Sequence, residues 1–478
     1  MDILPFVGLL IIIFVAFLLV RALFFNPYEE DTVPPLNEEI DRERAVESLA
    51  RMIQCRTVSY NDTRLEDENE FANFKELLKE RYPLVHQNCE LSHIDRTGLL
   101  YRWPGKKSEN PTVLMSHYDV VPAAEEEWEH PPFAGIIKEG HLWGRGTLDT
   151  KATLCGIMEA AEKLISEGFV PEQDIFFSFA GDEETNGTGT PAIVEHLEGR
   201  GIKPALVIDE GGAVVEGVVP GVKEKCALVG TGEKGKVHIR LSVKSQGGHG
   251  SIPPPVSPVG ILAKAVSKIE NKPFKFHLTR PAQEMFDTLG RHTGLGLKLV
   301  FANMKIFIPL LNLASRKLGG EFNALMRTTT AFTKMEGSEA INVFPPVAKV
   351  EADVRMIEGQ TKDSLIRGLK QKIGDNRVKV EAVDTIEVQP SSTTGNESWK
   401  RMVQGIKQVW PEALVSPYLM IACTDSRHYA RISDCVYRFS AMELTTEERQ
   451  MIHGNNERIP LDKIETAVKF YVGMIRNS

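Results

Sequence analysis

Histidine and acidic side chains follow several short apolar runs in this chain, and their types suit the binding of divalent metal ions. His117 and Asp119 are two residues apart, so on an extended segment both side chains face the same way. Asp119 can then accept a hydrogen bond from one ring nitrogen of His117, which leaves the other nitrogen free for a metal. Glu183 and Glu184 are adjacent carboxylates, which repel each other and need a nearby cation or a raised pKa when buried.

Three further side chains complete a set that can bind two ions. Asp149 follows a glycine-rich bend just before a helical segment, where an aspartate by itself is most often a helix cap. Asp209 follows another apolar run, and His453 stands near the C-terminus. We expect His117 and Asp209 to bind one ion, and His453 to bind the second together with Glu184. Asp149 is then predicted to bridge the ions, which lie about 3.5–4 Å apart in two-metal sites.

The types of these ligands indicate the metal and the chemistry. Two imidazoles and three carboxylates suit zinc, with cobalt or manganese as alternatives. Glu183, the member of the acidic pair that is not needed as a ligand, is expected to act as a general base. It would help to deprotonate a water molecule that attacks a carbonyl group polarised by the metal ions.

The elements that must position these residues follow an alternating α/β pattern. The expected buried strands and helices lie at 111–116, 152–166, 174–180, 191–198 and 205–208. This alternation predicts an α/β fold with a largely parallel sheet. Because His117 and most of the acids follow strand ends, they are expected at the carboxyl edge of the sheet, where open α/β sheets build their sites.

The pattern changes in the middle of the chain, where the expected elements run in the order βαββαβ. This order predicts a small domain at 224–386, inserted between two parts of the catalytic domain at 38–223 and 387–478. An additional stretch, 273–326, has no place in that order and contains a largely apolar segment at 295–313. It is expected either to be a helical hairpin packed on the insert's own core, or to line an apolar substrate pocket or contact a membrane.

The N-terminus predicts a membrane anchor. Residues 3–20 form an uncharged apolar run of 18 residues. At about 1.5 Å per residue it reaches roughly 27 Å, close to a hydrocarbon core of about 30 Å. A cleaved signal peptide is less favoured, because the sequence has no basic n-region and no A-x-A-like site. We therefore expect a transmembrane helix within 1–25, followed by a Pro-rich, acidic linker at 26–37.

Composition excludes some partners. The chain has 478 residues, which predicts two or three domains, and its 42% hydrophobic and 25% charged residues are ordinary for a folded protein. A net charge of −9 argues against nucleic acid as a partner, because no basic field attracts phosphates. The six cysteines are scattered without a CxxC pair, so a thiolate metal site is not expected.

Eight motifs that contain these residues resemble, in the same order, the aminoacylase/carboxypeptidase family of dizinc metallopeptidases. They are HYDVVPA, GRGTLDTK, GDEETNGTG, IDEGG, GGHGSIPP, NVFPPVA, TDSRHY and HGNNERIP. Within that family, they are most similar to the branch of carboxypeptidase S and N-fatty-acyl-amino acid synthase/hydrolase. The resemblance covers about 40–476 and implies a zinc-binding catalytic domain with an inserted lid or dimerisation domain. It also implies that Asp119 orients the ligand and that Glu183 is the general base.

The resemblance extends to residues outside the metal set. His249 in GGHGS resembles the family's lid histidine, which stabilises an oxyanion across a domain or subunit boundary. Asn342 and Arg355 resemble residues that bind the carboxylate end of the substrate, and the guanidinium of Arg427 in TDSRHY can do the same. One departure concerns this carboxylate pocket, because Cys423 precedes TDSR where the family often has glycine.

These observations predict a zinc-dependent hydrolase of amide or peptide bonds in substrates with a free carboxylate. It would be a carboxypeptidase or an N-acyl-amino acid amidohydrolase, held by a single N-terminal helix and able to form a homodimer through the lid domain. The resemblance places the catalytic domain on the extracytoplasmic or lumenal side. The alternative is a catalytically silent, membrane-tethered binding or dimerisation module of the same fold, which the intact ligand set and Glu183 argue against.

Overall fold

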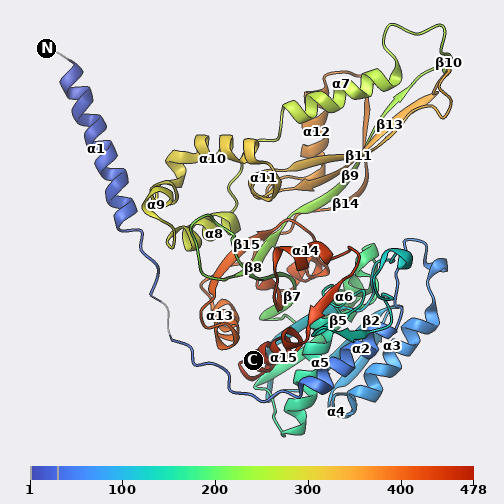
Figure 1. Ribbon diagram of the computed structural model, residues 1–478, viewed down its shortest axis with the longest axis vertical. Coiled ribbons are helices and arrows are strands. Elements are labelled where there is room, and N and C mark those ends of the chain that lie inside the picture. Colours follow the sequence, from blue (N-terminus) through green and yellow to red (C-terminus); the bar gives the residue numbers. More distant parts are fainter. Residues whose placement is uncertain (1–2, 30–31) are drawn as a thin grey trace.

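The computed structural model describes residues 3–29 and 32–478, and the side chains of all these residues except 3 and 4 (Figure 1). It contains a long N-terminal helix, a large α/β domain and an inserted domain that extends away from it (Figure 1). Of the expected anchor at 1–25 and linker at 26–37, residues 1–2 and 30–31 lie outside the described part.

The large domain is built on an eight-stranded, mostly parallel sheet, as predicted. In spatial order its strands are β1 (Glu90–Ile94), β2 (Gly98–Trp103), β6 (Gln173–Ala180), β3 (Lys107–His117), β7 (Leu206–Val215), β16 (Val436–Glu443), β8 (Cys226–Glu233) and β15 (Leu414–Met420). The pairs β6–β3, β3–β7, β7–β16 and β8–β15 are parallel. Residues 111–117 of β3 are all buried, which explains why a central parallel strand has a continuous apolar sequence.

Helices cover both faces of this sheet. One face carries α2 (Arg42–Gln54), α3 (Glu68–Arg81), α4 (Pro83–Asn88), α5 (Lys151–Ser166), α13 (Glu397–Val409) and α15 (Leu461–Arg476). The other face carries α6 (Gly189–Gly199) and the 3-10 helix η4 (Asp425–Arg431) over a smaller core that includes Val113, Phe176 and Val207. The short elements η1 (Thr63–Leu65), η2 (Glu125–Glu127), η3 (Glu183–Thr185) and α14 (Thr446–Met451) lie in connections.

A small antiparallel sheet brings two distant motifs together. Its order is β17 (Arg458–Pro460), β5 (His141–Trp143) and β4 (Ile136–Lys138). Because β5 leads directly into GRGTLD and β17 directly follows HGNNE, the pairing places the loop of Asp149 beside the loop of His453.

The inserted domain has its own antiparallel sheet in the order β11 (Thr329–Glu336), β13 (Val347–Met356), β9 (Gly235–Lys244) and β14 (Lys379–Ile386). Helices α7 (Pro258–Asn271) and α12 (Lys362–Ile373) pack on it, so the elements follow the expected βαββαβ order. The short strands β10 (Gly248–His249) and β12 (Val343–Phe344) pair at its far end (Figure 1). Strand β8 pairs with β15 in the main sheet, and the insert's own sheet begins with β9.

The additional stretch forms α8 (Arg280–Gly290), α9 (Leu295–Phe301), α10 (Met304–Leu318) and α11 (Gly320–Met326). The expectation that it packs on the insert's own core is wrong. Phe286, Phe301 and Met326 belong to the core of the large domain, while the insert's core contains no residue of these helices. Helix α8 lies against β15 and β8, so the stretch is a helical annex of the catalytic domain.

Helix α1 (Ile3–Leu23) is apolar except for Arg21 in its last turn, and its segment Pro5–Leu23 is long and apolar enough to cross a membrane. Most of its described side chains are exposed, whereas Leu18 and Ala22 are buried. A signal sequence would have the same length and composition.

Candidate metal centre

His117 ends β3 with its side chain buried at the carboxyl edge of the sheet, and its neighbour Asp119 fixes its orientation. The Nδ1 atom of His117 lies 3.0 Å from the carbonyl oxygen of Asp119 and 3.3 Å from its carboxylate Oδ1. Both oxygens are acceptors, so Nδ1 is assigned the proton, and Nε2 is the ring nitrogen that faces the acidic cluster. The Asp119 carboxylate also accepts hydrogen bonds from the backbone N–H groups of Glu183 and Glu184, at 3.1 Å each. Asp119 therefore positions the acidic pair as well as the imidazole.

Asp149 lies between the two histidines. Its Oδ1 is 3.0 Å from Nε2 of His117, and its Oδ2 is 3.1 Å from Nε2 of His453. The same Nε2 of His453 is 3.1 Å from the Glu184 carboxylate. A carboxylate whose two oxygens face two different ligand sets has the arrangement expected of a bridge between two ions.

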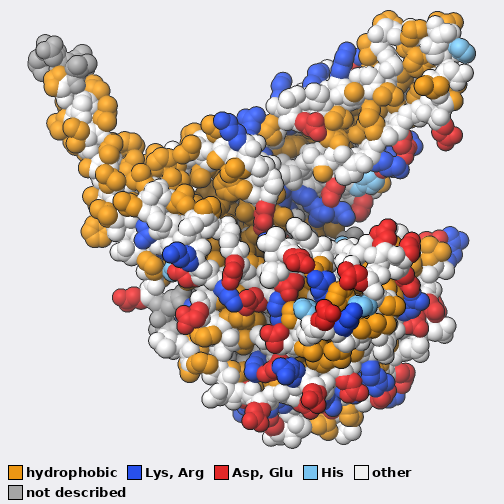
Figure 2. Space-filling model, in the orientation of Figure 1, with side chains coloured by type: hydrophobic (Ala, Val, Ile, Leu, Met, Phe, Trp, Pro, Cys, Tyr) orange, Lys and Arg blue, Asp and Glu red, His pale blue; other side chains and the backbone are white. Residues whose placement is uncertain are grey.

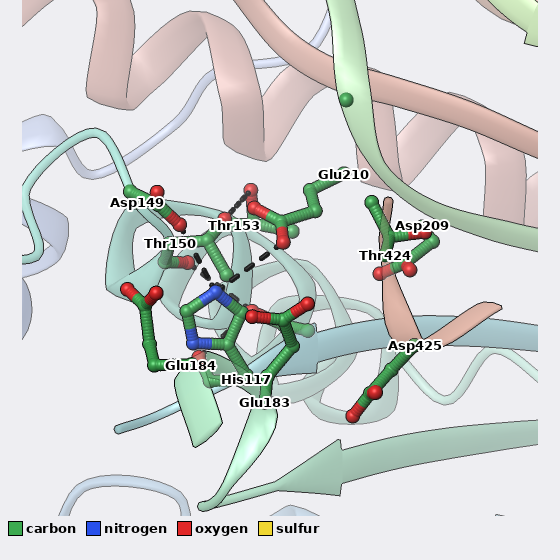
Figure 3. Close-up of polar contacts among 12 residues, drawn as sticks. His117, Asp149, Thr150, Thr153, Glu183, Glu184, Asp209, Glu210, Thr424 and Asp425 are labelled. Atoms are coloured by element: carbon green, nitrogen blue, oxygen red, sulfur yellow. Dashed lines mark hydrogen bonds and ion pairs between the residues drawn. The ribbon is translucent and has the colours of Figure 1, made fainter. Parts of the chain in front are cut away.

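Glu210, rather than Asp209, completes the cluster around His117 (Figure 3). Its Oε1 lies 3.3 Å from Nε2 of His117, and Figure 3 shows its carboxylate near the imidazole. Asp209 points away, toward Thr424, and accepts a hydrogen bond from the backbone N–H of Ser426 at 3.1 Å. The reason is strand alternation, because successive residues of β7 face opposite sides. The structure thus brings Glu210 to His117, while the expected ligand Asp209 of the same motif faces Ser426.

The cluster contains more carboxyl groups than its two imidazoles can neutralise by charge. Burial raises the pKa of Glu183 well above its usual range, and the neighbouring Asp425 raises it further. Burial likewise raises the pKa of Glu210 to about 8. Hydrogen bonds to Asp149 and Glu184 raise the pKa of His453 to about 10. A cation among these groups would offset both the burial and the mutual repulsion that raise the pKa of the carboxyls.

The donor atoms also match the requirements of divalent ions. Ligand atoms of His117, Asp149 and Glu184 all lie within 4.8 Å of one another, as do those of His117, Glu183 and Glu210. Imidazole nitrogen and carboxylate oxygen are the donors that zinc, cobalt and manganese take. The residues present therefore fit a two-metal centre.

The loop that presents Asp149 is held by a buried residue that the sequence reasoning did not single out. Glu457 accepts hydrogen bonds from the backbone N–H groups of Gly146 and Leu148, at 3.1 Å and 2.7 Å, and pairs with Arg145 at 2.7 Å. It lies in HGNNERIP, only four residues after His453, so one short segment carries His453 and also supports the loop of Asp149. The sequence does offer one clue to this role, because Glu457 is the only acidic residue in HGNNERIP.

Arg427 lies buried in the large domain, and Arg355 lies at the junction with the insert. The Arg427 guanidinium donates to the carbonyl oxygen of Thr424 at 2.6 Å and lies 3.4 Å from the Asp425 carboxylate. Arg355, on β13 of the insert, approaches the Cys423 sulfur at 3.7 Å and is thus next to the large domain. Both guanidinium groups therefore belong to the region around TDSR.

His249 and Asn342 lie together, away from the metal cluster. His249 is on exposed β10, and the backbone N–H of Gly250 donates to the Asn342 carbonyl oxygen at 2.6 Å. These strands occupy the far end of the insert, separated in Figure 1 from the sheet edge that carries His117. Within one chain, the structure does not bring either residue to the metal cluster.

A largely parallel sheet whose carboxyl edge carries imidazole and carboxylate side chains suits a metal-dependent hydrolase, and comparisons with known proteins agree. Residues 113–477 match the family model described as Peptidase family M20/M25/M40. The chain is 37% identical over 440 residues to the probable carboxypeptidase S-like 2 of Dictyostelium discoideum, covering 90% of this chain and 84% of the relative. It is 36% identical over 449 residues to the N-fatty-acyl-amino acid synthase/hydrolase PM20D1 of Xenopus tropicalis, covering 92% and 87%.

Among solved structures, the M20 family metallo-carboxypeptidase Sso-CP2 from Sulfolobus solfataricus has the same fold. The TM-score is 0.66 at 17% identity, over 90% of this chain and 98% of that chain. This chain belongs to the M20/M25/M40 peptidase family. It is an enzyme, and its relatives support hydrolysis of amide bonds.

Proposed function

We propose that this chain is a two-zinc amidohydrolase that cleaves the amide bond of N-acyl amino acids carrying a free carboxylate. The observation that carries the proposal is Asp149, whose two carboxylate oxygens contact His117 and His453 separately. We assign His117 and Glu210 to one ion and Glu184 and His453 to the other, with Asp149 shared. Cobalt or manganese would fit the same donors.

When both ions are bound, they make a water molecule more acidic and polarise the substrate carbonyl. The chain's own residues then manage the proton. Glu183 adjoins the ligand Glu184 but is not needed as a ligand, so its carboxylate can accept the proton of the attacking water. It then delivers that proton to the nitrogen of the departing amine. Asp119 keeps the metal-facing imidazole and the base in place, because its carboxylate contacts the His117 ring and accepts hydrogen bonds from the backbone of Glu183 and Glu184.

The substrate's carboxylate is assigned to the arginines near TDSR. Arg427 and Arg355 offer planar guanidinium groups, which bind a carboxylate through two parallel hydrogen bonds. Since Arg355 belongs to the insert and Arg427 to the large domain, a bound carboxylate would connect the two domains. The nearby Cys423 would shape this end of the pocket.

We further propose that the insert is a lid and dimerisation domain that supplies His249 and Asn342 after domain closure or from a second chain. The proposal is supported by their exposure at the insert's far end, where they are accessible to a partner. Light scattering coupled to size exclusion should give the mass of a dimer, and a monomer that is fully active would exclude the second chain.

The choice of an N-acyl amino acid over a peptide is supported by the apolar side chains exposed on α1 and α10 and by the relatives that are N-fatty-acyl-amino acid synthase/hydrolases. An assay of N-oleoyl-phenylalanine against a dipeptide with the same C-terminal residue tests it. We expect higher kcat/KM for the acyl amino acid in the zinc-loaded enzyme, and a clear preference for the dipeptide would indicate a carboxypeptidase. Metal analysis of the same sample should give two equivalents per chain.

We also propose that α1 is a single-pass anchor with the catalytic domain on the extracytoplasmic or lumenal side. Its length and composition support the span, and the side is the one that the sequence resemblance implies. In sealed microsomes, the body should resist added protease until detergent is present. Digestion without detergent would reverse the assigned orientation.

A further inference from the structure

Helix α10 exposes an apolar stripe that no described part of the chain covers. Ile306, Leu310 and Leu313 recur at intervals of four and three residues, so they share one face of the helix. Each is between 42% and 51% exposed, while Leu311, on the opposite face, is 7% exposed. Figure 2 shows hydrophobic side chains continuing from this region onto α1.

All charged residues of α10 are basic. Lys305, Arg316 and Lys317 are exposed on the same helix, and α10 has no acidic residue. An apolar face bordered by lysine and arginine is the composition of helices that lie in a membrane interface. Helices α9 and α10 are bent by 106° relative to each other, so the pair is not a straight span.

The lower end of α1 is fixed to these helices. Leu18 is buried, and Asn303, at the start of α10, donates a hydrogen bond from Nδ2 to the Leu18 carbonyl oxygen at 3.2 Å. Arg291, just after α8, lies 4.3 Å from the ring centroid of Phe25 and donates to the carbonyl oxygen of Asn26 at 2.8 Å. The annex and α1 therefore form one packed unit.

This attachment sets the depth of the annex if α1 crosses a bilayer. The 21 residues of α1 span about 31 Å, which only just matches a hydrocarbon core of about 30 Å. Leu18 precedes the end of the helix by five residues, or about 7.5 Å. The start of α10 lies beside Leu18, so it must enter the membrane to the depth of about 5–10 Å at which interfacial helices lie.

We propose that α9 and α10 form an interfacial membrane support that seats the stripe of Ile306, Leu310 and Leu313 among lipid headgroups and acyl chains. The occupant is a lipid bilayer, and the basic border favours anionic lipids. The support holds the large domain at the membrane surface in one orientation. This inference depends on the proposed anchoring by α1 and is independent of the catalytic chemistry.

Depth-dependent quenching in the full chain tests the inference. Single variants Leu310→Cys, Phe14→Cys and Ile341→Cys are labelled with the environment-sensitive fluorophore NBD and reconstituted in nanodiscs of phosphatidylcholine and phosphatidylserine. Ile341 is a matched apolar control, fully exposed on the insert. The parental protein, whose cysteines are buried or half-buried, gives the background labelling. Spin-labelled lipids with the quencher near the headgroup or deep in the acyl chain report the depth of each probe.

We expect the probe at 310 to shift to shorter wavelength and to lose most of its emission to the shallow quencher. The probe at 14 should respond to the deep quencher, and the probe at 341 to neither. A blue shift at 310 without quenching would mean contact with a second chain, and would overturn the inference. So would an unquenched, water-exposed probe at 310 beside a quenched probe at 14. If the probe at 14 also remains unquenched, α1 does not span and the inference fails with the anchor, while amide hydrolysis can still be measured separately.

Discussion

At the level of single residues, the centre depends on which oxygen faces which imidazole. Asp149 contacts His117 through Oδ1 and His453 through Oδ2, so it belongs to both halves of the site. Glu183 has no ligand role in our assignment, and burial together with Asp425 raises the pKa of its carboxyl. A raised pKa makes the carboxylate a stronger base, which suits a group that takes the proton of the attacking water and holds it until the departing amine accepts it.

Replacement of Glu183 by Gln should separate chemistry from metal binding. The amide keeps the size of the side chain but cannot accept a proton, so kcat should fall by about 10²–10⁴-fold. Metal content and melting temperature should stay near those of the parent, which mass spectrometry of bound metal and a thermal melt would verify. Retention of most of the activity would assign the base elsewhere.

The choice between Glu210 and Asp209 is testable with a matched pair. Glu210→Gln removes a carboxylate that faces His117, so metal affinity should fall by more than the roughly 10–100-fold caused by losing a group that only supports a ligand. Asp209→Asn changes a side chain that faces Ser426, so its effect on affinity should be far smaller. Titration of the two metal-free variants with zinc would decide, and the reverse order would restore Asp209 as the ligand.

The sequence predicts which strands meet at this edge of the sheet, but it does not predict which face of a strand each acid points to. Apolar runs identify β3, β6 and β7, and parallel strands bring the residues after them to one edge. Two adjacent acids in IDEGG, however, give no periodicity that tells which of them faces His117. That depends on the register of β7 against β3 and β16, which only long-range pairing fixes.

At the level of elements, the pairing of β5 with β17 explains how the two sequence-distant parts of the catalytic domain contribute to one site. The pairing of β17 with β5 aligns Arg458 with Trp143, just before the loop that carries Asp149. The carboxylate oxygens of Glu457 then accept hydrogen bonds from the backbone N–H groups of that loop. Sequence patterns did not indicate this role, because the loop and its support are about 310 residues apart.

Replacement of Glu457 by Gln should destabilise the loop and the whole domain. It leaves the guanidinium of Arg145 buried without its ion pair, a change that costs about 3–5 kcal/mol in other proteins. Urea unfolding should show the loss, and zinc affinity should weaken because Asp149 is no longer held. Glu447→Gln is the matched control, because Glu447 is exposed on the neighbouring α14 and should change neither quantity. Equal stability of the two variants would contradict the role of Glu457.

The helical annex shows the same limit of local patterns. One of the two interpretations of its apolar segments placed them on the insert's own core, and the other placed them at a substrate pocket or a membrane. Phe286 and Phe301 instead stack with ring centroids 5.4 Å apart in the core of the large domain. Helical periodicity identifies an apolar face, but it does not say which of two nearby cores that face joins.

At the level of the whole molecule, the cores on the two faces of the main sheet and the separate core of the insert predict two folding units. The core of the insert includes Ile239, Val350 and Leu365 and is separate from the core that surrounds the main sheet. All proposed metal ligands lie in the large domain, on β3, near α5 and η3, on β7 and after α14. Metal binding should therefore stabilise one unit and leave the other unchanged, because a ligand stabilises only the state that binds it.

Calorimetry of the detergent-solubilised chain can measure this separation. With free zinc at about 100 times its Kd, binding adds about 2.7 kcal/mol to the large domain, so chelation should lower that domain's melting transition and zinc should restore it. The insert's transition should stay in place. Leu365→Ala identifies it, because loss of this buried side chain should destabilise the insert by about 2–5 kcal/mol. A single transition that moves with both zinc and Leu365→Ala would mean that the domains unfold as one unit, coupled through the junction where Arg355 meets Cys423.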